Sequence, residues 1–115
     1  MVKDANILIL GITFKENCPD IRNTKIVDIY HTLREYTPNI TIYDPWANAE
    51  HVKSEYGVAV ENDKSSIQNA KYDAVILAVA HKEFLEMDVK ALVKEDGVIY
   101  DVKGILPREI VDARL

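Results

Sequence analysis

Three cationic side chains stand in two stretches of the sequence that each follow an apolar run. Lys15 and Arg22 belong to residues 11–22, and Lys103 belongs to residues 101–104. Amine and guanidinium groups bind phosphate oxygens through charge-assisted hydrogen bonds, which are stronger than neutral ones. If the fold brings the two stretches together, they form a site for a phosphate or a pyrophosphate. The alternative is that these side chains are only solvated in surface loops.

Three other residues have side chains of types that take part in chemistry. Asp44 follows an apolar run and could bind a ribose hydroxyl, but we favour the role of ending a strand before a turn. His81 could contact a ligand, and again we favour a polar residue that ends a strand. Cys18 is the one cysteine, and we expect neither a disulfide nor a catalytic thiolate from it. No His, Asp and Glu set has metal-ligand spacing, so we expect no metal site.

Apolar runs provide the strands that must position these residues. Nearly continuous runs occupy residues 5–11, 40–43, 74–80 and 98–100, which is typical of strands covered on both faces of a parallel sheet. Residues 58–60 could add a short piece beside the second of these strands.

Helical patterns separate the runs. From Thr24 to Leu33 apolar residues recur with the spacing of one helix face, and Asn23 or Thr24 can cap the start. Pro45 can open the next helix, because a first turn does not need its missing N–H group. Further helical segments are expected within residues 45–56, 63–70, 88–94 and 107–115.

This alternation predicts an α/β fold: a single domain of three layers around a mostly parallel, Rossmann-like sheet. Ligands of such folds bind at the edge where the strands end. Residues 11–22, 44–45, 81–82 and 101–104 follow strands at this edge. The first segment exceeds the usual connection of about 2–6 residues, so we expect it to be functional.

The bulk composition excludes several classes of protein. The chain has 115 residues, 19 acidic and 14 basic, with a net charge of -5. A nucleic-acid-binding domain is normally basic, so nucleic acid is not an expected partner. No apolar run approaches the roughly 18 residues of a membrane span, and the N-terminus lacks the layout of a signal peptide. We expect a cytoplasmic protein without a membrane partner.

Residues 11–25, GITFKENCPDIRNTK, resemble the opening of the C-terminal domain of the UDP-glucose/GDP-mannose dehydrogenase family. That family has a Phe-Lys pair followed by Asp-x-Arg and a helix, here Phe14-Lys15 and Asp20-Ile21-Arg22. The resemblance extends along nearly the whole chain through IYDP at 42–45, DAVILAVAHKEF at 73–84 and DVKGIL at 101–106.

The resemblance implies an NAD-dependent enzyme that oxidises the C6 alcohol of a UDP-sugar to a carboxylate in two hydride transfers. Phe14, Lys15 and Lys103 would then bind the substrate, and Lys103 could do so across a subunit boundary. Arg22 would reach the NAD cofactor, and Asp20 would orient Arg22. The sequence resembles most the bacterial branch that acts on UDP-N-acetylhexosamines in surface polysaccharide biosynthesis.

The family's NAD-binding and catalytic domains have no counterpart in this sequence. The four glycines include no G-x-G-x-x-G fingerprint, and the family's catalytic cysteine lies upstream of the matching region. Residues 1–115 are therefore expected to be the nucleotide-sugar-binding C-terminal domain, without catalytic residues and inactive alone. The expected partners are the UDP-sugar and the N-terminal part of the same enzyme, which would be a homo-oligomer with an exposed apolar docking surface here.

A signalling receiver domain has the same order of elements and is the alternative. Asp44 would be its phosphoacceptor, and Lys103 its lysine partner. Receivers resemble one another in having an acidic pair after the first strand, where this chain has residues 11–14, GITF, and a long cationic loop.

Overall fold

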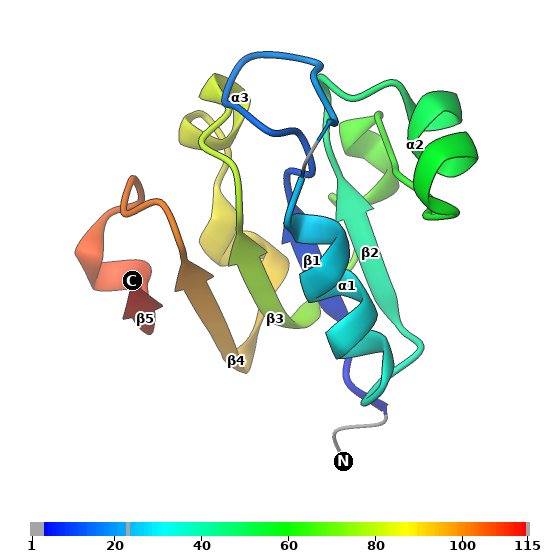
Figure 1. The fold of residues 1–115 in the computed structure, drawn as a ribbon. Coiled ribbons are helices and arrows are strands. Elements are labelled where there is room, and N and C mark those ends of the chain that lie inside the picture. The colour runs from blue at the N-terminus through cyan, green and yellow to red at the C-terminus, as the bar shows by residue number, and fades with distance from the viewer. Residues whose placement is uncertain (1–3, 23, 115) are drawn as a thin grey trace.

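The computed structural model describes residues 4–22 and 24–114. Within these residues one sheet has the strand order β2-β1-β3-β4-β5, and all neighbouring strands run parallel (Figure 1). The expected Rossmann-like sheet is confirmed. The strands are β1 (Ile7–Leu10), β2 (Ile40–Tyr43), β3 (Tyr72–Leu77), β4 (Val93–Asp101) and β5 (Ala113–Arg114).

Both faces of β1 are buried. Ile7 and Ile9 of β1 belong to one apolar core, whereas Leu8 and Leu10 belong to a second core on the other face. Successive side chains of a strand point to opposite faces, so an apolar residue is needed at every position. This explains why the first run has no polar alternation.

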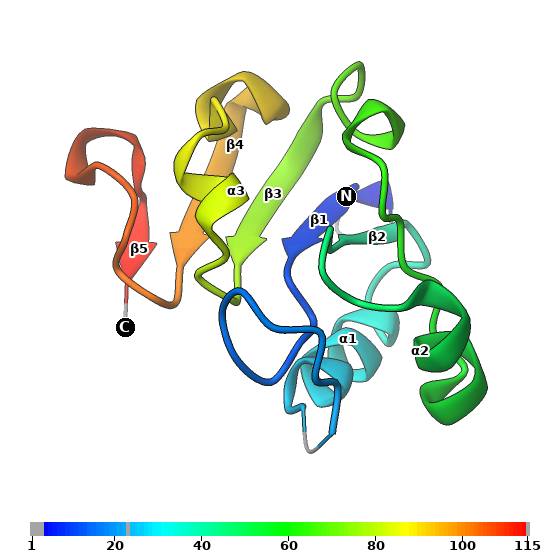
Figure 2. The same cartoon turned by 90° about the horizontal axis from the view of Figure 1, so that it is seen from above.

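Helices and turns cover the two faces and complete the three layers. The first core includes Val27 of α1 (Ile26–Arg34) and Val52 of α2 (Ala49–Tyr56). The second core includes Phe84 of α3 (Lys82–Leu85) and Val89 of the 3₁₀ turn at Val89–Leu92. Figure 2 shows α1 and α2 on one side of the sheet and the turn before β4 on the other.

The strand order creates a switch point between β1 and β3. The chain leaves β1 for β2 on one side and later returns to form β3 on the other side. A crevice forms at the carboxyl ends of strands where the direction of the order changes, and ligands of open α/β sheets bind there. In Figure 1 the blue loop after β1 arches over this edge towards α3.

The start of α1 agrees with the sequence pattern. Thr24 Oγ1 accepts a hydrogen bond of 3.2 Å from the amide of Ile26, whereas the other candidate cap, Asn23, lies outside the described residues. With nine residues, α1 is the longest helix described. No helix of residues 4–22 or 24–114 is long and apolar enough to cross a membrane.

The second helix begins later than expected. α2 starts at Ala49 and not at Pro45, because Asn48 Oδ1 caps it by accepting a 3.0 Å hydrogen bond from the amide of His51. The residues after Pro45 instead fold around the carboxylate of Asp44, which competes for their amide groups. This turn is part of the site described below.

Two short segments contain less regular structure than expected. Residues 58–60 form no strand, and only the next residue, Glu61, makes an isolated bridge, to Tyr43 at the end of β2. In the segment 63–70 the structure has a 3₁₀ turn at Lys64–Ser66 instead of an α-helix.

The helix expected at 88–94 is wrong, and the terminal helix turn expected within 107–115 is present only as a short 3₁₀ turn. The first is the 3₁₀ turn at Val89–Leu92, and Val93 already belongs to β4, where it pairs with β3. In the second, the 3₁₀ turn at Arg108–Ile110 is followed by β5, which adds to the open edge of β4. Pairing with an existing strand gives hydrogen-bond partners to backbone groups that would have none in so short a helix.

Candidate functional site

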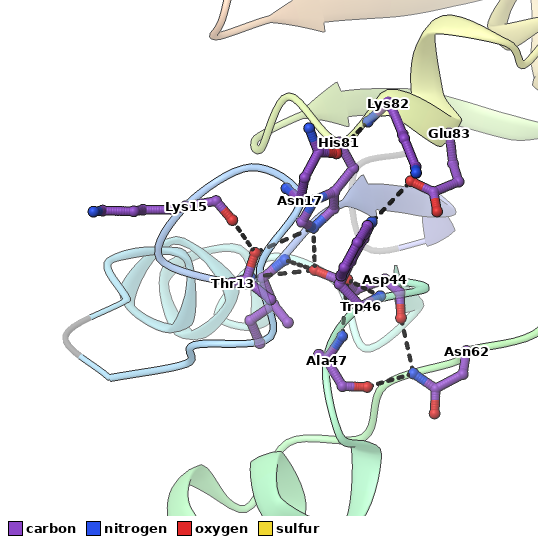
Figure 3. Close-up of polar contacts among 11 residues, drawn as sticks. Thr13, Lys15, Asn17, Asp44, Trp46, Ala47, Asn62, His81, Lys82 and Glu83 are labelled. Atoms are coloured by element: carbon purple, nitrogen blue, oxygen red, sulfur yellow. Dashed lines mark hydrogen bonds and ion pairs between the residues drawn. The ribbon is translucent and has the colours of Figure 1, made fainter.

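A fully buried carboxylate holds together the segments that follow β1 and β2. Oδ2 of Asp44 accepts hydrogen bonds from the amides of Ile12 and Thr13, at 2.7 and 3.2 Å. Its Oδ1 accepts from the amides of Trp46 and Ala47, at 2.7 and 3.1 Å. Asp44 therefore fixes the start of the long loop against the turn after β2 (Figure 3).

These contacts keep Asp44 ionised. Burial alone would raise the pKa of its carboxyl group, but hydrogen bonds from His81 and from the amides of Ile12 and Trp46 outweigh this effect. The pKa consequently lies below its ordinary value. Asp44 ends its strand as the sequence suggests, and its burial leaves a ribose hydroxyl no access to it.

His81 is more deeply buried than we expect for a polar residue that only ends a strand. Its side chain is fully buried, and its Nε2 atom lies 3.0 Å from Asp44 Oδ2 and 3.1 Å from Thr13 Oγ1. Its Nδ1 atom lies 2.8 Å from the amide nitrogen of Asn17. His81 therefore contacts the long loop at two points, as Figure 3 shows.

Trp46 covers this buried polar cluster. Its ring stacks on His81 with 6.1 Å between centroids, and its Nε1–H donates a 2.8 Å hydrogen bond to Glu83 Oε1. The Nζ atom of Lys82 lies 5.6 Å from the centre of the Trp46 ring, within cation–π range. Trp46 thus connects the turn after β2 to α3 and covers the imidazole ring of His81.

A cavity of about 200 Å³ opens beside the cluster at the switch point. Phe14 and Lys103 both line it, so two of the three residues expected to bind substrate share one cavity. Phe14 is 52% exposed, which leaves its ring accessible to a ligand. The full lining comprises Thr13, Phe14, Glu16, Thr24, Lys25, Ile26, Ala78, Val79 and Lys103.

A rigid turn after β4 presents Lys103 to this cavity. Asp101 is fully buried, and its carboxylate accepts hydrogen bonds from the amides of Lys103, Gly104 and Leu106, at 3.1, 2.7 and 2.8 Å. Gly104 has a φ of +69°, in the left-handed region that favours glycine. The sequence DVKG thus encodes a turn that fixes the backbone of its lysine.

Lys15 lies outside this cavity. Its carbonyl accepts a 2.8 Å hydrogen bond from Thr13 Oγ1, while its exposed side chain extends away from the buried cluster in Figure 3. The loop places Lys15 next to Phe14 in sequence, but the two side chains do not share the cavity lining.

Arg22 is held by Asp20, as expected. The Nε and Nη2 atoms donate hydrogen bonds of 3.0 Å each to the two carboxylate oxygens of Asp20. This side-chain contact with Arg22 is the main reason why the pKa of Asp20 falls to about 2. The Arg22 side chain is 83% exposed and accessible to an anion outside the domain.

Residues 8–108 match the model of the UDP-glucose/GDP-mannose dehydrogenase family, UDP binding domain. The chain belongs to this family. The match extends from β1 to the turn after β4, and therefore contains the cavity and the buried cluster. The receiver alternative is not supported, and the burial of Asp44 is incompatible with a phosphoacceptor that must meet its donor.

Named relatives agree with the family match. The chain is 45% identical to UDP-N-acetyl-D-glucosamine 6-dehydrogenase of Salmonella typhi, over 99% of this chain and 27% of the relative. It is 40% identical to Protein CapL of Staphylococcus aureus, over 91% of this chain and 24% of the relative. The chain thus spans about a quarter of the length of these curated relatives.

A solved structure of a UDP-D-ManNAc dehydrogenase from Pyrococcus horikoshii has the same fold. The TM-score is 0.74 at 19% identity, over 98% of this chain and 25% of the other. This likeness shows the fold, and the family match alone assigns the chain to the UDP binding domain.

Sequence reasoning missed three residues of this UDP binding domain. Lys25 and Glu16 line the cavity, although neither is one of the Phe-Lys and Asp-x-Arg positions of the family motif. Asn17 has a φ of +55° and binds His81 through its backbone, a contact between residues 64 positions apart. An asparagine in a long loop is the only local signal, because Asn tolerates the left-handed region better than most residues.

Proposed function

We propose that the cavity at the β1–β3 switch point binds the nucleotide part of a UDP-sugar. The enzyme to which this domain belongs would oxidise the sugar C6 alcohol to a carboxylate with NAD, in the cytoplasm. The observation that carries the proposal is that Phe14 and Lys103, from distant parts of the chain, line the same cavity.

The chemistry of the lining fits a nucleoside diphosphate. The exposed ring of Phe14 offers a flat apolar face for stacking against a planar base. Lys103 and Lys25 supply positive charge for the diphosphate, against the single negative charge of Glu16. Lys15, which extends beyond this cavity, would contact a more distant part of the same substrate.

The proposed role of Arg22 is a contact with NAD held by the rest of the enzyme. Its guanidinium group is fixed by Asp20 and largely exposed, which suits an anionic group approaching from another domain. NAD would accept the hydride from the sugar, and no residue of this domain is assigned to that transfer. Cys18 lies half-buried in the same loop and has no assigned part in the chemistry.

An uncovered stretch of the sheet is the proposed contact with the remainder of the enzyme. Val98 of β4 pairs with Ala74 of β3, and Tyr100 with Ile76, so these side chains form two neighbouring rows on one face. Val98 is 48% exposed, and the other three are only partly buried. Apolar surface of this kind marks an interface, and the full enzyme is proposed to be a homo-oligomer.

The proposed substrate class is a UDP-N-acetylhexosamine used for surface polysaccharide. This rests on the 45% and 44% identity to two UDP-N-acetyl-D-glucosamine 6-dehydrogenases, against 28% to 30% for relatives named as UDP-glucose 6-dehydrogenases. Which hexosamine is used would follow from the catalytic domain and not from the cavity described here.

Kinetics of the full-length enzyme test the proposal. Lys15→Ala and Lys103→Ala should each lower kcat/KM for the UDP-sugar by a factor of about 10 to 100, since a lost charge-assisted contact costs about 1.5–3 kcal/mol. Lys90→Ala is the matched control, because Lys90 is exposed in the turn before β4, at the amino end of that strand. Equal kinetics for all three variants would contradict the proposal.

A further inference from the structure

The imidazole of His81 sits between the two ends of one loop segment. Nε2 lies 3.1 Å from Thr13 Oγ1, and Nδ1 lies 2.8 Å from the amide nitrogen of Asn17. Between these two residues lie Phe14 and Lys15, to which the proposed function assigns substrate contacts. One fully buried ring thus contacts both boundaries of a five-residue segment.

The hydrogen-bond partners determine the tautomer of His81. A backbone N–H group can only donate, so Nδ1 accepts from Asn17 and carries no proton. The proton therefore lies on Nε2, which faces the ionised carboxylate of Asp44 at 3.0 Å. The contacts of Thr13 agree with this tautomer. The hydroxyl of Thr13 donates its hydrogen to the carbonyl of Lys15, so Oγ1 is left to accept from the protonated Nε2 atom. The ring is neutral, and Asp44 selects its tautomer.

The far end of the segment depends on this tautomer. Asn17 adopts a φ of +55°, a conformation that needs support from its surroundings. The amide of Asn17 donates to His81, and its side-chain Oδ1 accepts a 2.7 Å hydrogen bond from the amide of Lys82. Residues 81 and 82 together therefore hold Asn17 at the end of β3.

We propose that His81 is a positioning residue that preorganises Phe14 and Lys15 for the substrate. It acts through Asp44, which sets the tautomer, and Asn17, which the unprotonated Nδ1 atom holds. A loop ordered before binding loses less conformational entropy when the ligand arrives, so its order contributes to affinity. This inference rests on the proposed function for its effect on substrate, whereas the tautomer and the loop order are properties of the ligand-free chain.

Two substitutions separate the two nitrogens. In His81→Asn, the amide oxygen lies near the position of Nδ1 and can still accept from Asn17, but the contact with Asp44 is lost. In His81→Gln, the longer amide reaches the position of Nε2 and can still donate to Asp44, but Asn17 loses its acceptor. A side chain that only fills space would not distinguish these variants by the nitrogen they imitate.

In the full-length enzyme, His81→Gln should raise KM for the UDP-sugar by about tenfold with little change in kcat, the upper range for one lost hydrogen bond. His81→Asn should keep KM within about threefold of the native value. A KM for His81→Asn equal to or above that for His81→Gln would overturn the positioning role.

Nuclear magnetic resonance of the ligand-free chain provides a second test of the role of His81. The ¹⁵N shifts of the native imidazole should show an unprotonated Nδ1 and a protonated Nε2, a measurement that needs no variant to fold. Amide relaxation of Phe14 to Glu16 should show faster, larger motion in His81→Gln than in His81→Asn. A proton on Nδ1, or equal order in both variants, would overturn the inference.

Lys15→Ala distinguishes failure of the inference from failure of the proposed function. A raised KM in Lys15→Ala without one in His81→Gln would overturn the role of His81 and leave the substrate assignment standing. Unchanged KM values in both, with the loop disordered in His81→Gln, would overturn the assignment of the loop to substrate and the role of His81 with it.

Discussion

Gly11 and Val79 meet so closely at the carboxyl ends of β1 and β3 that a Cβ added to Gly11 would lie 2.5 Å from the Cβ of Val79. The φ of Gly11 is +103°, a conformation that side chains disfavour. The long loop thus begins at a position where glycine is required twice, once for space and once for backbone conformation.

Gly11→Ala should therefore lower the free energy of unfolding by about 3 kcal/mol, combining strain with overpacking. Gly57→Ala is the control, because its φ is +70° but an added Cβ would meet no described atom within 4 Å. It should cost about 1 kcal/mol. Urea denaturation measures both, and equal losses would contradict the close packing of β1 against the segment after β3.

Asp44→Asn should destabilise the domain by about 3 kcal/mol at neutral pH, because an amide cannot accept from four N–H groups and its own hydrogens oppose some of them. The control is Asp96→Asn, an exposed position in β4, expected to change stability by less than about 0.5 kcal/mol. Chemical denaturation at several pH values measures the difference.

The difference in stability between the native chain and Asp44→Asn should depend on pH in one direction. The pKa of Asp44 is lowered on folding, so its contribution is fully present above the ordinary carboxyl value of 3.8 and is lost as the pH falls through the lower folded value. The native chain and Asp44→Asn should therefore converge in stability as the pH falls below that range. A difference that grew on acidification would contradict an ionised Asp44.

Asp20 should titrate at about 2 instead of 3.8, since its carboxylate is held ionised by the hydrogen bonds from Arg22. Above that pH the ion pair fixes the loop, and below it the contact is lost. Carboxyl carbon shifts measure the midpoint, and Arg22→Ala should return it towards 3.8. A midpoint that Arg22→Ala leaves in place would show that the pair is absent in solution.

The two phenylalanines should separate binding from stability. Phe14 is 52% exposed, so Phe14→Ala should cost less than about 1 kcal/mol of stability yet raise KM in the full-length enzyme. Phe84 is fully buried, and Phe84→Ala should cost about 3–5 kcal/mol. Thermal unfolding and initial-rate kinetics measure the two effects. A Phe14→Ala variant with native KM would remove the ring from the substrate site.

The sequence predicts the strands and the ligand edge because their signals are local. A continuous apolar run such as that around Ile9 requires two covered faces, and parallel strands bring their following segments to one edge. Phe14 and Lys103 share a cavity for this reason, although 89 sequence positions, the difference between 103 and 14, separate them. The family motifs then indicate which of the residues at this edge are proposed to bind substrate.

The remaining features depend on contacts that no local pattern encodes. The burial of His81 follows from the relative positions of β2, β3 and the long loop, which place Asp44 and Asn17 beside it. Similarly, the turn at Val89–Leu92 has an apolar pattern that suits a helix, and only the pairing of Val93 with β3 limits its length. Tertiary contacts override weak local preferences in segments this short.

Addition of UDP to the ¹⁵N-labelled chain tests the central claim most directly. We expect weak binding at millimolar UDP, with the largest amide shift changes at Phe14, Lys25 and Lys103, and much smaller changes with uridine, which lacks the diphosphate. Changes confined to the separate surface cavity lined by Ala49 and Val60, or equal changes with UDP and uridine, would contradict a diphosphate site at the β1–β3 switch point.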